Sequence, residues 1–527
     1  MVDPYEKIPE KSDPFWFEDV SLPRFESLEE NIKSDVVVVG GGITGIASAY
    51  LLSQQNMNVA LLESSRLLNG ATGHTTAKVT AQHSLIYDEL LNNFGYNVAR
   101  MYYEANTDAL HLVEKIITDE KIDCDFEKQD AFLYSTSGDY KVKLENEYKA
   151  YDRLNIKGQL TSKIPFDLSI ENALMMENQA QFHPLKYLSK LVDILKERGV
   201  KIYEDTTAIN VETDDSTKTQ TVITRNDKRI QCNHVLICSH FPFYEGRGLY
   251  FSRLYAERSY AMALQTKMAY PGGMYLSVDQ PTRSIRSAKL NNKEVTIIGG
   301  EEHKTGQGGD MIEHYRALKR FSDSLFGEKS YTILNRWSTQ DLVTLDKIPY
   351  IGPITKGQPN VLVATGYRKW GMTNSHVAAQ IMVDNILGNI NHAAEIFSPQ
   401  RFQADPSLKK FFLENLDVAK HLIKGKIEPA HATIDELEND EGAIVKINGE
   451  RKGAYRDEEG EVHIVDTTCT HAGCEVNWNS GERSWDCPCH GSRFSYTGDV
   501  LEGPAEKPLA KHDFSSFDVF DDEKTGY

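Results

Sequence analysis

The hydrophobic pattern near the start of the chain predicts a strand, a turn, a helix and a second strand. Residues 36–39 are four consecutive valines, as expected of a strand that is buried on both faces. Glycines follow, and residues 43–55 then have a helical pattern. Residues 58–63 (NVALLE) predict another buried strand. This order is typical of a βαβ unit in a parallel sheet.

The pattern further along alternates between helical and extended segments. Residues 87–121 predict one long helix. Residues 185–198 predict another, which ends at Gly199 because glycine is the usual residue after a helix. The other predicted elements are strands over residues 131–135, 235–238 and 361–365, a strand-rich region over 250–298, and a helix over 374–387 after a second glycine turn.

We expect four parts in this order along the chain. An N-terminal extension (1–33) should pack its aromatic cluster, Phe15 to Phe17, onto the body. The body covers residues 34–388, and a polar, helix-prone connecting arm covers 389–430. Residues 431–527 predict an all-β domain, with hairpin turns at Asn448-Gly449 and Glu459-Gly460.

Length and charge restrict the class of protein. A chain of 527 residues is long enough for two or three domains. Its net charge of −19 opposes binding to nucleic acid and to anionic membranes. The charge keeps the protein soluble or favours association with a basic redox partner. We find no secretion signal at the start and no membrane-spanning stretch of about 20 apolar residues, so we expect a cytoplasmic location.

A glycine motif lies at the predicted turn after the first strand. Gly40, Gly42 and Gly45 form G-x-G-x-x-G, with Ile43 and Thr44 between them. Glycines here permit a tight turn and a close approach of the backbone to a pyrophosphate, which the helix N-terminus attracts. Glu63 ends the second strand, where it can accept hydrogen bonds from a ribose. Only one convincing copy of the motif is present. A flavoprotein that is reduced by NAD(P)H through its own second nucleotide fold would usually carry two copies, so a single copy favours FAD and a small substrate that is oxidised directly.

Three segments of the body resemble the D-amino-acid oxidase-like family of FAD oxidoreductases: residues 36–63, the small-residue loop 70–77 (GATGHTTA), and residues 346–373. The resemblance implies a Rossmann-like α/β FAD-binding body with an α+β substrate domain. It assigns residues 34–86, 155–240 and 330–388 to the FAD part, and residues 87–154 and 241–329 to the substrate part. The FAD-binding residues that we expect are Gly40, Gly42, Ile43, Thr44, Gly45, Glu63, Ser64, Thr72, Gly73, His74, Thr75, Gly366, Gly371, Met372 and Thr373.

Candidates for the substrate site are few. Arg286 could pair with a substrate carboxylate through its two-pronged guanidinium, although a structural arginine is an equal reading. Tyr367, Trp370 and Trp337 could wall the pocket, although core packing is the usual role of buried aromatic rings. His74 falls where some relatives attach FAD covalently; a polar contact is the alternative. We identify no general base.

Cysteine and histidine alternate in two short motifs near the C-terminus. Cys469 and His471 form C-x-H, and Cys487 and His490 form C-x-x-H. One thiolate and one imidazole from each loop suit a 2Fe–2S cluster with two cysteines on one iron and two histidines on the other. Zinc is the rival reading, but zinc fingers place paired cysteines before paired histidines.

These motifs resemble those of Rieske proteins. The resemblance implies a disulfide between Cys474 and Cys489, which would tie the two loops together. It also implies that Ser492 hydrogen-bonds to a bridging sulfide. Phe494 stands where the respiratory proteins have a tyrosine that donates to a ligand sulfur, so we expect a lower reduction potential. Tyr496 could compensate for this loss.

The two sets of motifs together indicate an FAD-dependent oxidoreductase, more specifically a dehydrogenase. We expect a small amine, amino acid or related donor, and electron transfer through FAD and the cluster to an external carrier. The alternatives are a reductase fed by a ferredoxin-like donor and a redox sensor without turnover. A Rieske oxygenase would need a separate mononuclear iron site, and the acidic charge opposes a role in RNA modification.

Overall fold

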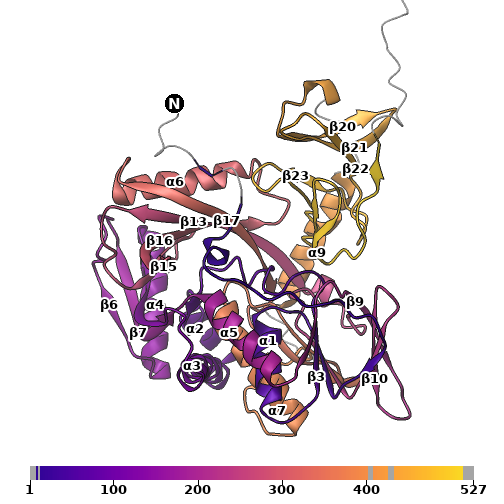
Figure 1. Ribbon diagram of the computed structural model, residues 1–527. Helices are drawn as coiled ribbons and strands as arrows, with labels where there is room; N and C mark the ends of the chain where they lie inside the picture. Colours follow the sequence, from indigo (N-terminus) through magenta and orange to yellow (C-terminus); the bar gives the residue numbers. More distant parts are fainter. Residues whose placement is uncertain (1–7, 10–11, 402–406, 425–432, 514–527) are drawn as a thin grey trace, which may run out of the picture. The chain divides into compact units, whose positions relative to one another are not determined.

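The computed structural model describes residues 8–9, 12–401, 407–424 and 433–513, and the chain divides into two units (Figure 1). The first unit contains residues 1–302 and 314–410. The second contains residues 411–527 and also the short segment 303–313. Parts of the expected arm (402–406 and 425–430) and the expected start of the last domain (431–432) lie outside the described residues.

A six-stranded sheet forms the centre of the first unit, and all its strands are parallel except β18 at the edge. Its order is β18 (Tyr350–Thr355), β19 (Gln358–Thr365), β12 (His234–Ile237), β2 (Val36–Val39), β3 (Val59–Leu62) and β8 (Lys201–Tyr203). The predicted strands over residues 36–39 and 58–63 are therefore confirmed as β2 and β3.

Both faces of this sheet are covered, which explains the run of four valines. Val36 and Val38 belong to the core on the side of three helices, and Val37 and Val39 belong to the core on the opposite side. The helices are α1 (Ile43–Ser53), α5 (Pro184–Glu197) and α7 (Gly371–Leu387), and α1 packs against the other two (Figure 1). On the opposite face, residues of a small four-stranded sheet belong to the same core as Val37 and Val39. The order of this small sheet is β1 (Ile32–Lys33), β11 (Arg229–Cys232), β10 (Gln220–Thr224) and β9 (Ala208–Thr213).

A nine-stranded, mostly antiparallel sheet forms the other half of the first unit. Its order is β17 (Tyr331–Thr344), β13 (Leu254–Thr266), β16 (Lys293–Lys304), β15 (Arg283–Leu290), β14 (Met274–Ser277), β5 (Glu127–Ser135), β7 (Asn172–Gln181) and β4 (Lys78–Val79), with β6 (Gly158–Thr161) beside β7. Strands β7 and β17 thus join this sheet, although their residues fall in ranges that we expected for the FAD part.

The helix predicted over residues 87–121 is two helices, so this prediction was wrong. Helix α2 (Tyr87–Phe94) and helix α3 (Tyr96–Asp119) meet at Gly95, whose φ is +83°. Only glycine adopts this conformation readily, so the chain turns there. The remaining helices of the unit are α4 (Gly138–Leu154), α6 (Ile312–Phe326), α8 (Ala394–Phe397) and the short 3-10 turns η1 (Phe15–Phe17) and η2 (Tyr250–Ser252).

The aromatic cluster of the N-terminal extension packs into the body, as predicted. Phe15 and Trp16 are completely buried in the main core of the first unit. Their ring centroids lie 4.0 Å apart, and the Phe15 ring also contacts Trp337 edge-on at 5.9 Å. The extension therefore fills part of the body's own core.

The second unit contains two small antiparallel sheets and one long helix. The first sheet has the order β20 (Glu441–Ile447), β21 (Glu450–Arg456), β22 (Val462–Asp466) and β27 (Lys511–His512). The second has the order β23 (Asn477–Asn479), β24 (Ser484–Asp486), β25 (Arg493–Ser495) and β26 (Val500–Glu502). The other elements are α9 (Ser407–Lys424), which begins in the first unit, and the 3-10 turn η3 (Ile434–Glu436).

One prediction for this unit can be checked directly. Asn448 and Gly449 have φ values of +50° and +85° and connect β20 to β21, as predicted for a hairpin turn. Among the described residues, no helix combines the length and the apolar character that crossing a bilayer requires.

Candidate functional site

The glycine loop between β2 and α1 is packed so closely that side chains are excluded. Gly40 has a φ of +114°, and a Cβ atom there would lie 2.4 Å from the carbonyl oxygen of Cys238. A Cβ atom on Gly45 would lie 2.0 Å from the carbonyl oxygen of Gly40. Helix α1 therefore starts directly against the strand end, with its first backbone N–H groups at the loop, which is the geometry that binds a pyrophosphate. The backbone fits a dinucleotide such as FAD.

Glu63 stands just beyond the end of β3 and holds this loop. Its carboxylate accepts hydrogen bonds from the backbone N–H of Gly41 at 2.8 Å and from that of Ser65 at 3.0 Å. Ser64 also donates its hydroxyl to the same carboxylate. The expected ribose-binding position is thus occupied by an acidic side chain that is already oriented.

The loop of residues 70–77, which we call the small-residue loop, approaches the start of α1. Thr72 accepts the backbone N–H of Ile43 on its hydroxyl oxygen at 3.1 Å. The ring nitrogen Nδ1 of His74 lies 3.0 Å from the carbonyl oxygen of Gly70, within the same loop. Gly73 packs against Phe17, because a Cβ atom there would lie 2.5 Å from its ring.

Three long side chains hold the carbonyl oxygens of the small-residue loop from outside. Trp337 donates from its indole to His74 at 2.9 Å, and Trp16 donates to Thr75 at 2.8 Å. Arg286 donates from Nη1 to the carbonyl oxygens of Thr76 and Ala77. Each of these donors satisfies a backbone carbonyl that is at least partly buried, so the protein itself holds the loop in place.

Arg286, a sequence candidate for holding a substrate carboxylate, is thus engaged with the backbone. Besides the two bonds from Nη1, its Nε donates to the carbonyl oxygen of Ser287 at 2.7 Å. Burial lowers the pKa of its guanidinium to about 9. This geometry makes Arg286 a support of the small-residue loop.

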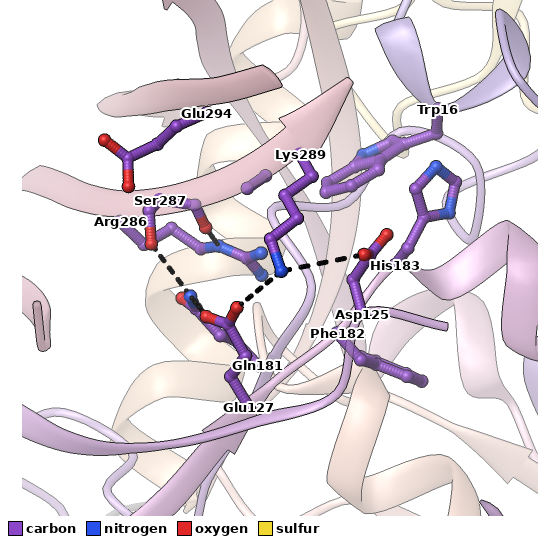
Figure 2. Close-up of a pocket in the computed structure, with 11 residues that line it drawn as sticks. Trp16, Asp125, Glu127, Gln181, Phe182, His183, Arg286, Ser287, Lys289 and Glu294 are labelled. Atoms are coloured by element: carbon purple, nitrogen blue, oxygen red, sulfur yellow. Dashed lines mark hydrogen bonds and ion pairs between the residues drawn. The ribbon is translucent and has the colours of Figure 1, made fainter. Parts of the chain in front are cut away.

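Charged and polar side chains line a small cavity beside Arg286 (Figure 2). Its volume is about 30 Å³, which is room for one or two water molecules. Lys289 crosses it to Glu127 at 2.9 Å and approaches Asp125 at 3.9 Å, and Gln181 donates to Ser287 at 2.9 Å. The charged groups are paired with one another, so the cavity carries no substrate in our account.

Lys78 is a half-buried lysine near Arg286 that sequence reasoning missed. Its ammonium donates to the carbonyl oxygen of Tyr275 at 2.9 Å and to the hydroxyl of Ser284 at 2.7 Å. Burial, and then repulsion from Arg286, lowers the pKa of Lys78 to about 7. No local signal marks this lysine, because strands far from it in sequence bury it.

Residues 366–370, which we call the segment before α7, and the first turn of α7 contact α1 and residues 80–83. The hydroxyl of Tyr367 lies 3.1 Å from that of Thr44 on α1. The ring of Trp370 stacks on His83 with centroids 4.7 Å apart, and Arg368 donates to the carbonyl oxygen of His83. Thr373 donates to the carbonyl oxygen of Thr80 at 3.0 Å.

Helix α7 begins at Gly371, three residues earlier than predicted. Its N-terminus therefore includes Gly371, Met372 and Thr373, and a helix N-terminus stabilises negative charge. Gly366 begins the segment before α7 with a φ of +78°. The structure brings Thr44 of α1 and Tyr367 of this segment together, while Trp370 is engaged in stacking.

The four expected cluster ligands lie on two loops of the second unit. Each loop is closed by its own backbone hydrogen bonds, from Cys469 N–H to Cys474 O at 2.7 Å and from Cys487 N–H to Ser492 O at 2.8 Å. The rings of His471 and His490 lie 4.9 Å apart. This places two thiols and two imidazoles at the ends of two matched loops.

The donor set fits a 2Fe–2S cluster. The thiols of Cys469 and Cys487 are buried and hydrogen-bonded to each other, and this bond lowers the pKa of Cys469 and raises the pKa of Cys487. The two sulfur atoms therefore lie side by side, as two ligands of one iron must. Ser492 hydrogen-bonds to the Cys469 thiol and accepts the backbone N–H of Ala505 at 3.0 Å. His471 is exposed, whereas His490 is 8% exposed.

A disulfide joins Cys474 and Cys489, as the resemblance implied, with their Cα atoms 6.5 Å apart. Phe494 is completely buried and pairs with Trp485 across β24 and β25. The ring of Tyr496 packs on Tyr455 at 4.9 Å and on His463 at 5.0 Å. Tyr496 is thus engaged with the first small sheet.

Comparison with known families gives two matches that together cover most of the chain. Residues 35–385 match the family described as FAD dependent oxidoreductase. Residues 429–513 match the Rieske [2Fe-2S] domain. The first match covers the glycine loop, the small-residue loop and the segment before α7, and the second covers all four cluster ligands.

Individual proteins agree with these matches. The chain is 47% identical to the Rieske 2Fe-2S iron-sulfur protein YhfW of Bacillus subtilis (strain 168), over 96% of this chain and 98% of that protein. It is 23% identical to gamma-glutamylputrescine oxidoreductase of Escherichia coli (strain K12), over 69% of this chain and 86% of that protein. Glycine oxidase from Geobacillus kaustophilus has a similar fold, with a TM-score of 0.60 at 17% identity, covering 70% of this chain and 99% of that one.

Proposed function

This chain belongs to the FAD dependent oxidoreductase family and carries a Rieske [2Fe-2S] domain, and we propose that it is a dehydrogenase for a small amine or amino-acid-like donor. The observation that supports the proposal is the presence, in one chain, of a glycine loop closed to side chains and of two Cys–His loops with the residue types of a 2Fe–2S ligand set. When bound, FAD supplies two-electron chemistry, and the cluster supplies a one-electron route to an external carrier.

The residues of the first unit have binding and orienting roles in this proposal. The N-terminus of α1 and the loop at Gly40 to Gly45 bind the pyrophosphate, and Glu63 binds a ribose. The small-residue loop and the N-terminus of α7 would hold the flavin. The backbone N–H groups at Gly371 to Thr373 would then stabilise negative charge on the reduced ring.

Two arguments support an amine or amino-acid-like donor: the names of similar proteins and the chemistry of hydride loss from an amine. The names of two similar proteins specify an amine-containing or amino-acid substrate, gamma-glutamylputrescine and glycine. We identify no general base, and a neutral amine needs none if it loses a hydride directly. We expect the donor to bind near the small-residue loop, which Trp337 and Arg286 of the nine-stranded sheet support.

The exit route for electrons is at the cluster histidines. His471 is exposed and His490 is largely buried, so an external carrier meets the cluster at His471. The net charge of −19 favours a carrier with a basic face, because opposite charges steer association. A one-electron centre at the surface is useful when the acceptor is a carrier and not oxygen.

A steady-state experiment tests this proposal. Holoprotein is mixed in air with a panel of amines and amino acids, and hydrogen peroxide is measured beside the reduction of a one-electron acceptor such as ferricenium. We expect one donor class to reduce ferricenium much faster than it produces peroxide. A Cys487→Ser variant, which loses a cluster ligand, is the control and should lose the ferricenium activity. Rapid peroxide formation that is unchanged in Cys487→Ser would identify an oxidase and overturn the proposal.

A further inference from the structure

A short segment from the middle of the chain completes the second unit. Residues 303–313 run from the last two residues of β16 to the start of α6 and lie within the range matched by the FAD dependent oxidoreductase family, yet they belong to the second unit. Gly306 has a φ of +74°, and a Cβ atom there would lie 2.7 Å from the backbone nitrogen of Pro488. The segment is therefore in direct backbone contact with the residue between Cys487 and Cys489.

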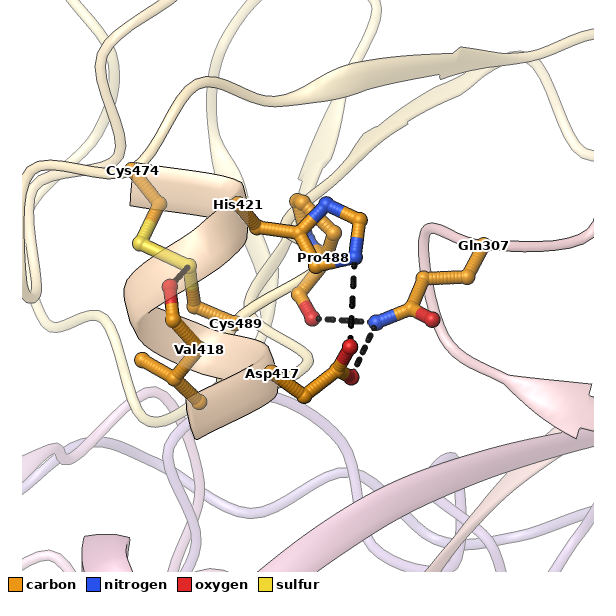
Figure 3. Close-up of a disulfide and its surroundings, with 7 residues drawn as sticks. All are labelled: Gln307, Asp417, Val418, His421, Cys474, Pro488 and Cys489. Atoms are coloured by element: carbon orange, nitrogen blue, oxygen red, sulfur yellow. Dashed lines mark hydrogen bonds and ion pairs between the residues drawn. A yellow bond between two sulfur atoms is a disulfide. The ribbon is translucent and has the colours of Figure 1, made fainter. Parts of the chain in front are cut away.

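Gln307 binds the same residue through its side chain. Its amide nitrogen Nε2 lies 3.1 Å from the carbonyl oxygen of Pro488 and 3.1 Å from the carboxylate of Asp417 on α9 (Figure 3). Pro488 belongs to the loop that supplies Cys487 and His490 and one half of the disulfide. One half-buried amide thus links this ligand loop to the helix beside it.

Further polar contacts hold the segment in place. Asn477 donates to the carbonyl oxygen of Gly306 at 2.9 Å. Lys304 pairs with Asp417 at 2.8 Å and with Glu414 at 2.6 Å. Asp417 therefore has a cationic partner and still accepts from Gln307, so the position of the amide is fixed from both sides.

Helix α9 contacts the other half of the same loop. The sulfur of Cys489 lies 3.8 Å from the carbonyl oxygen of Val418, in the turn of α9 next to Asp417 (Figure 3). Gln307 and Val418 thus flank the Cys487–Cys489 peptide from two elements outside the Rieske sheets. The matched Rieske range, residues 429–513, contains neither of them.

We propose that Gln307 is a positioning residue for the cluster, which holds the second ligand loop through the carbonyl group of Pro488 and thereby sets the reduction potential. Hydrogen bonds and charges around a cluster tune its potential, because they stabilise the reduced and oxidised forms differently. The N–H of Gln307 points its positive end toward the ligand loop, where it would favour the reduced form of a bound cluster. The proposal rests on the cluster and is independent of the identity of the donor.

The test is an electron paramagnetic resonance redox titration of the full-length holoprotein, with dithionite as reductant. Gln307→Met keeps the length of the side chain and removes its donors, and Gln307→Glu also adds a negative charge. At the wild-type midpoint we expect the ratio of reduced to oxidised cluster to fall at least threefold in Gln307→Met and further in Gln307→Glu. Hydrogen exchange over residues 487–492 should become faster in both.

The matched control is Asn439→Leu. Asn439 is an exposed amide of the same unit that donates to the carbonyl oxygen of Glu458 at 3.1 Å, away from both ligand loops in sequence. In this variant the midpoint potential of the cluster and the rate of hydrogen exchange over residues 487–492 should equal those of the wild type. Gly306→Ala is a second variant, whose Cβ must displace Pro488, and it should also lower the reduced fraction. Wild-type midpoints and exchange rates in Gln307→Met and Gly306→Ala would overturn the proposal.

Discussion

Arg286 on β15 donates a hydrogen bond from Nη1 to the carbonyl oxygen of Thr76 across 2.7 Å. This bond ties the nine-stranded sheet to the small-residue loop, and a second bond from the same nitrogen reaches Ala77. The guanidinium is buried, and burial lowers its pKa to about 9. A buried cation on neutral carbonyl groups is costly to leave unsatisfied, so the arginine and the loop constrain each other.

Replacing Arg286 by lysine should weaken FAD binding. Lysine keeps the charge but lacks the fork that reaches both carbonyl groups and Ser287. We expect the dissociation constant of FAD to rise roughly tenfold, which corresponds to about 1.4 kcal/mol. Fluorescence titration of the apoprotein measures it. Arg229→Lys is the control, because Arg229 is half exposed in a pair with Glu212, and unchanged binding in Arg286→Lys would contradict the supporting role.

Gly45→Ala should abolish FAD binding. The new Cβ would lie 2.0 Å from the carbonyl oxygen of Gly40, so α1 must move away from the strand end and its N-terminus leaves the phosphate position. Gly138→Ala is the matched control, because a Cβ at Gly138 meets no atom within 4 Å and should be tolerated. The flavin content of the two purified variants, from absorbance, decides this prediction. A Gly45→Ala protein with full flavin content would refute it.

Glu147 should make stability fall as pH rises. It is completely buried, and burial raises its pKa to about 8, while it accepts backbone N–H groups of Tyr87 and Asp88. Between pH 4.3, roughly the pKa of this carboxyl in the unfolded chain, and pH 8, about its pKa in the folded chain, the native state holds a proton that the unfolded state has released. The stabilising contribution is therefore fully present below about pH 4.3. It falls by at most roughly 1.4 kcal/mol per pH unit as the pH rises toward 8.

The variant Glu147→Gln cannot titrate and should flatten this dependence. Melting temperatures of the wild type and the variant, measured from pH 5 to pH 9, should diverge toward alkaline pH in favour of the variant. Glu145→Gln, on the same helix and partly exposed, is the control. Parallel curves for the wild type and Glu147→Gln would show that Glu147 does not titrate in this window.

Phe494→Tyr should raise the reduction potential of the cluster. The hydroxyl would restore a hydrogen bond to a ligand sulfur, and such a bond stabilises the reduced form. A net gain of about 1 kcal/mol corresponds to roughly 40 mV for a one-electron couple. Tyr496→Phe is the informative control: because Tyr496 packs on Tyr455 and His463, its hydroxyl should not affect the potential. A lower potential in Tyr496→Phe would mean that Tyr496 supplies the missing bond.

The sequence predicts features whose cause is local. The valines of β2 indicate a strand buried on both faces because every side chain in the run is apolar. The four cluster ligands are recognisable because each loop carries its own cysteine and histidine at short spacing. The break at Gly95 was also local, but we had interpreted residues 87–121 as one continuous helix.

Features that depend on distant contacts were not predictable. Arg286 supports a loop 210 positions away in sequence, and its sequence context is equally compatible with a substrate contact. Gln307 reaches Pro488 across 181 positions from a glycine-rich segment that resembles an ordinary loop. Pairings of this kind depend on how the sheets and loops pack, and no periodicity or motif encodes them.

The most direct test of the central claim is the order in which the two centres are reduced. Holoprotein and a candidate amine or amino acid are mixed anaerobically, and flavin absorbance is followed beside the electron paramagnetic resonance signal of rapidly frozen samples. Our account predicts that one donor bleaches the flavin first and that the reduced Rieske signal then appears. If no donor bleaches the flavin, while reduced ferredoxin fills the cluster first and the flavin afterwards, the protein is a reductase and the account is contradicted.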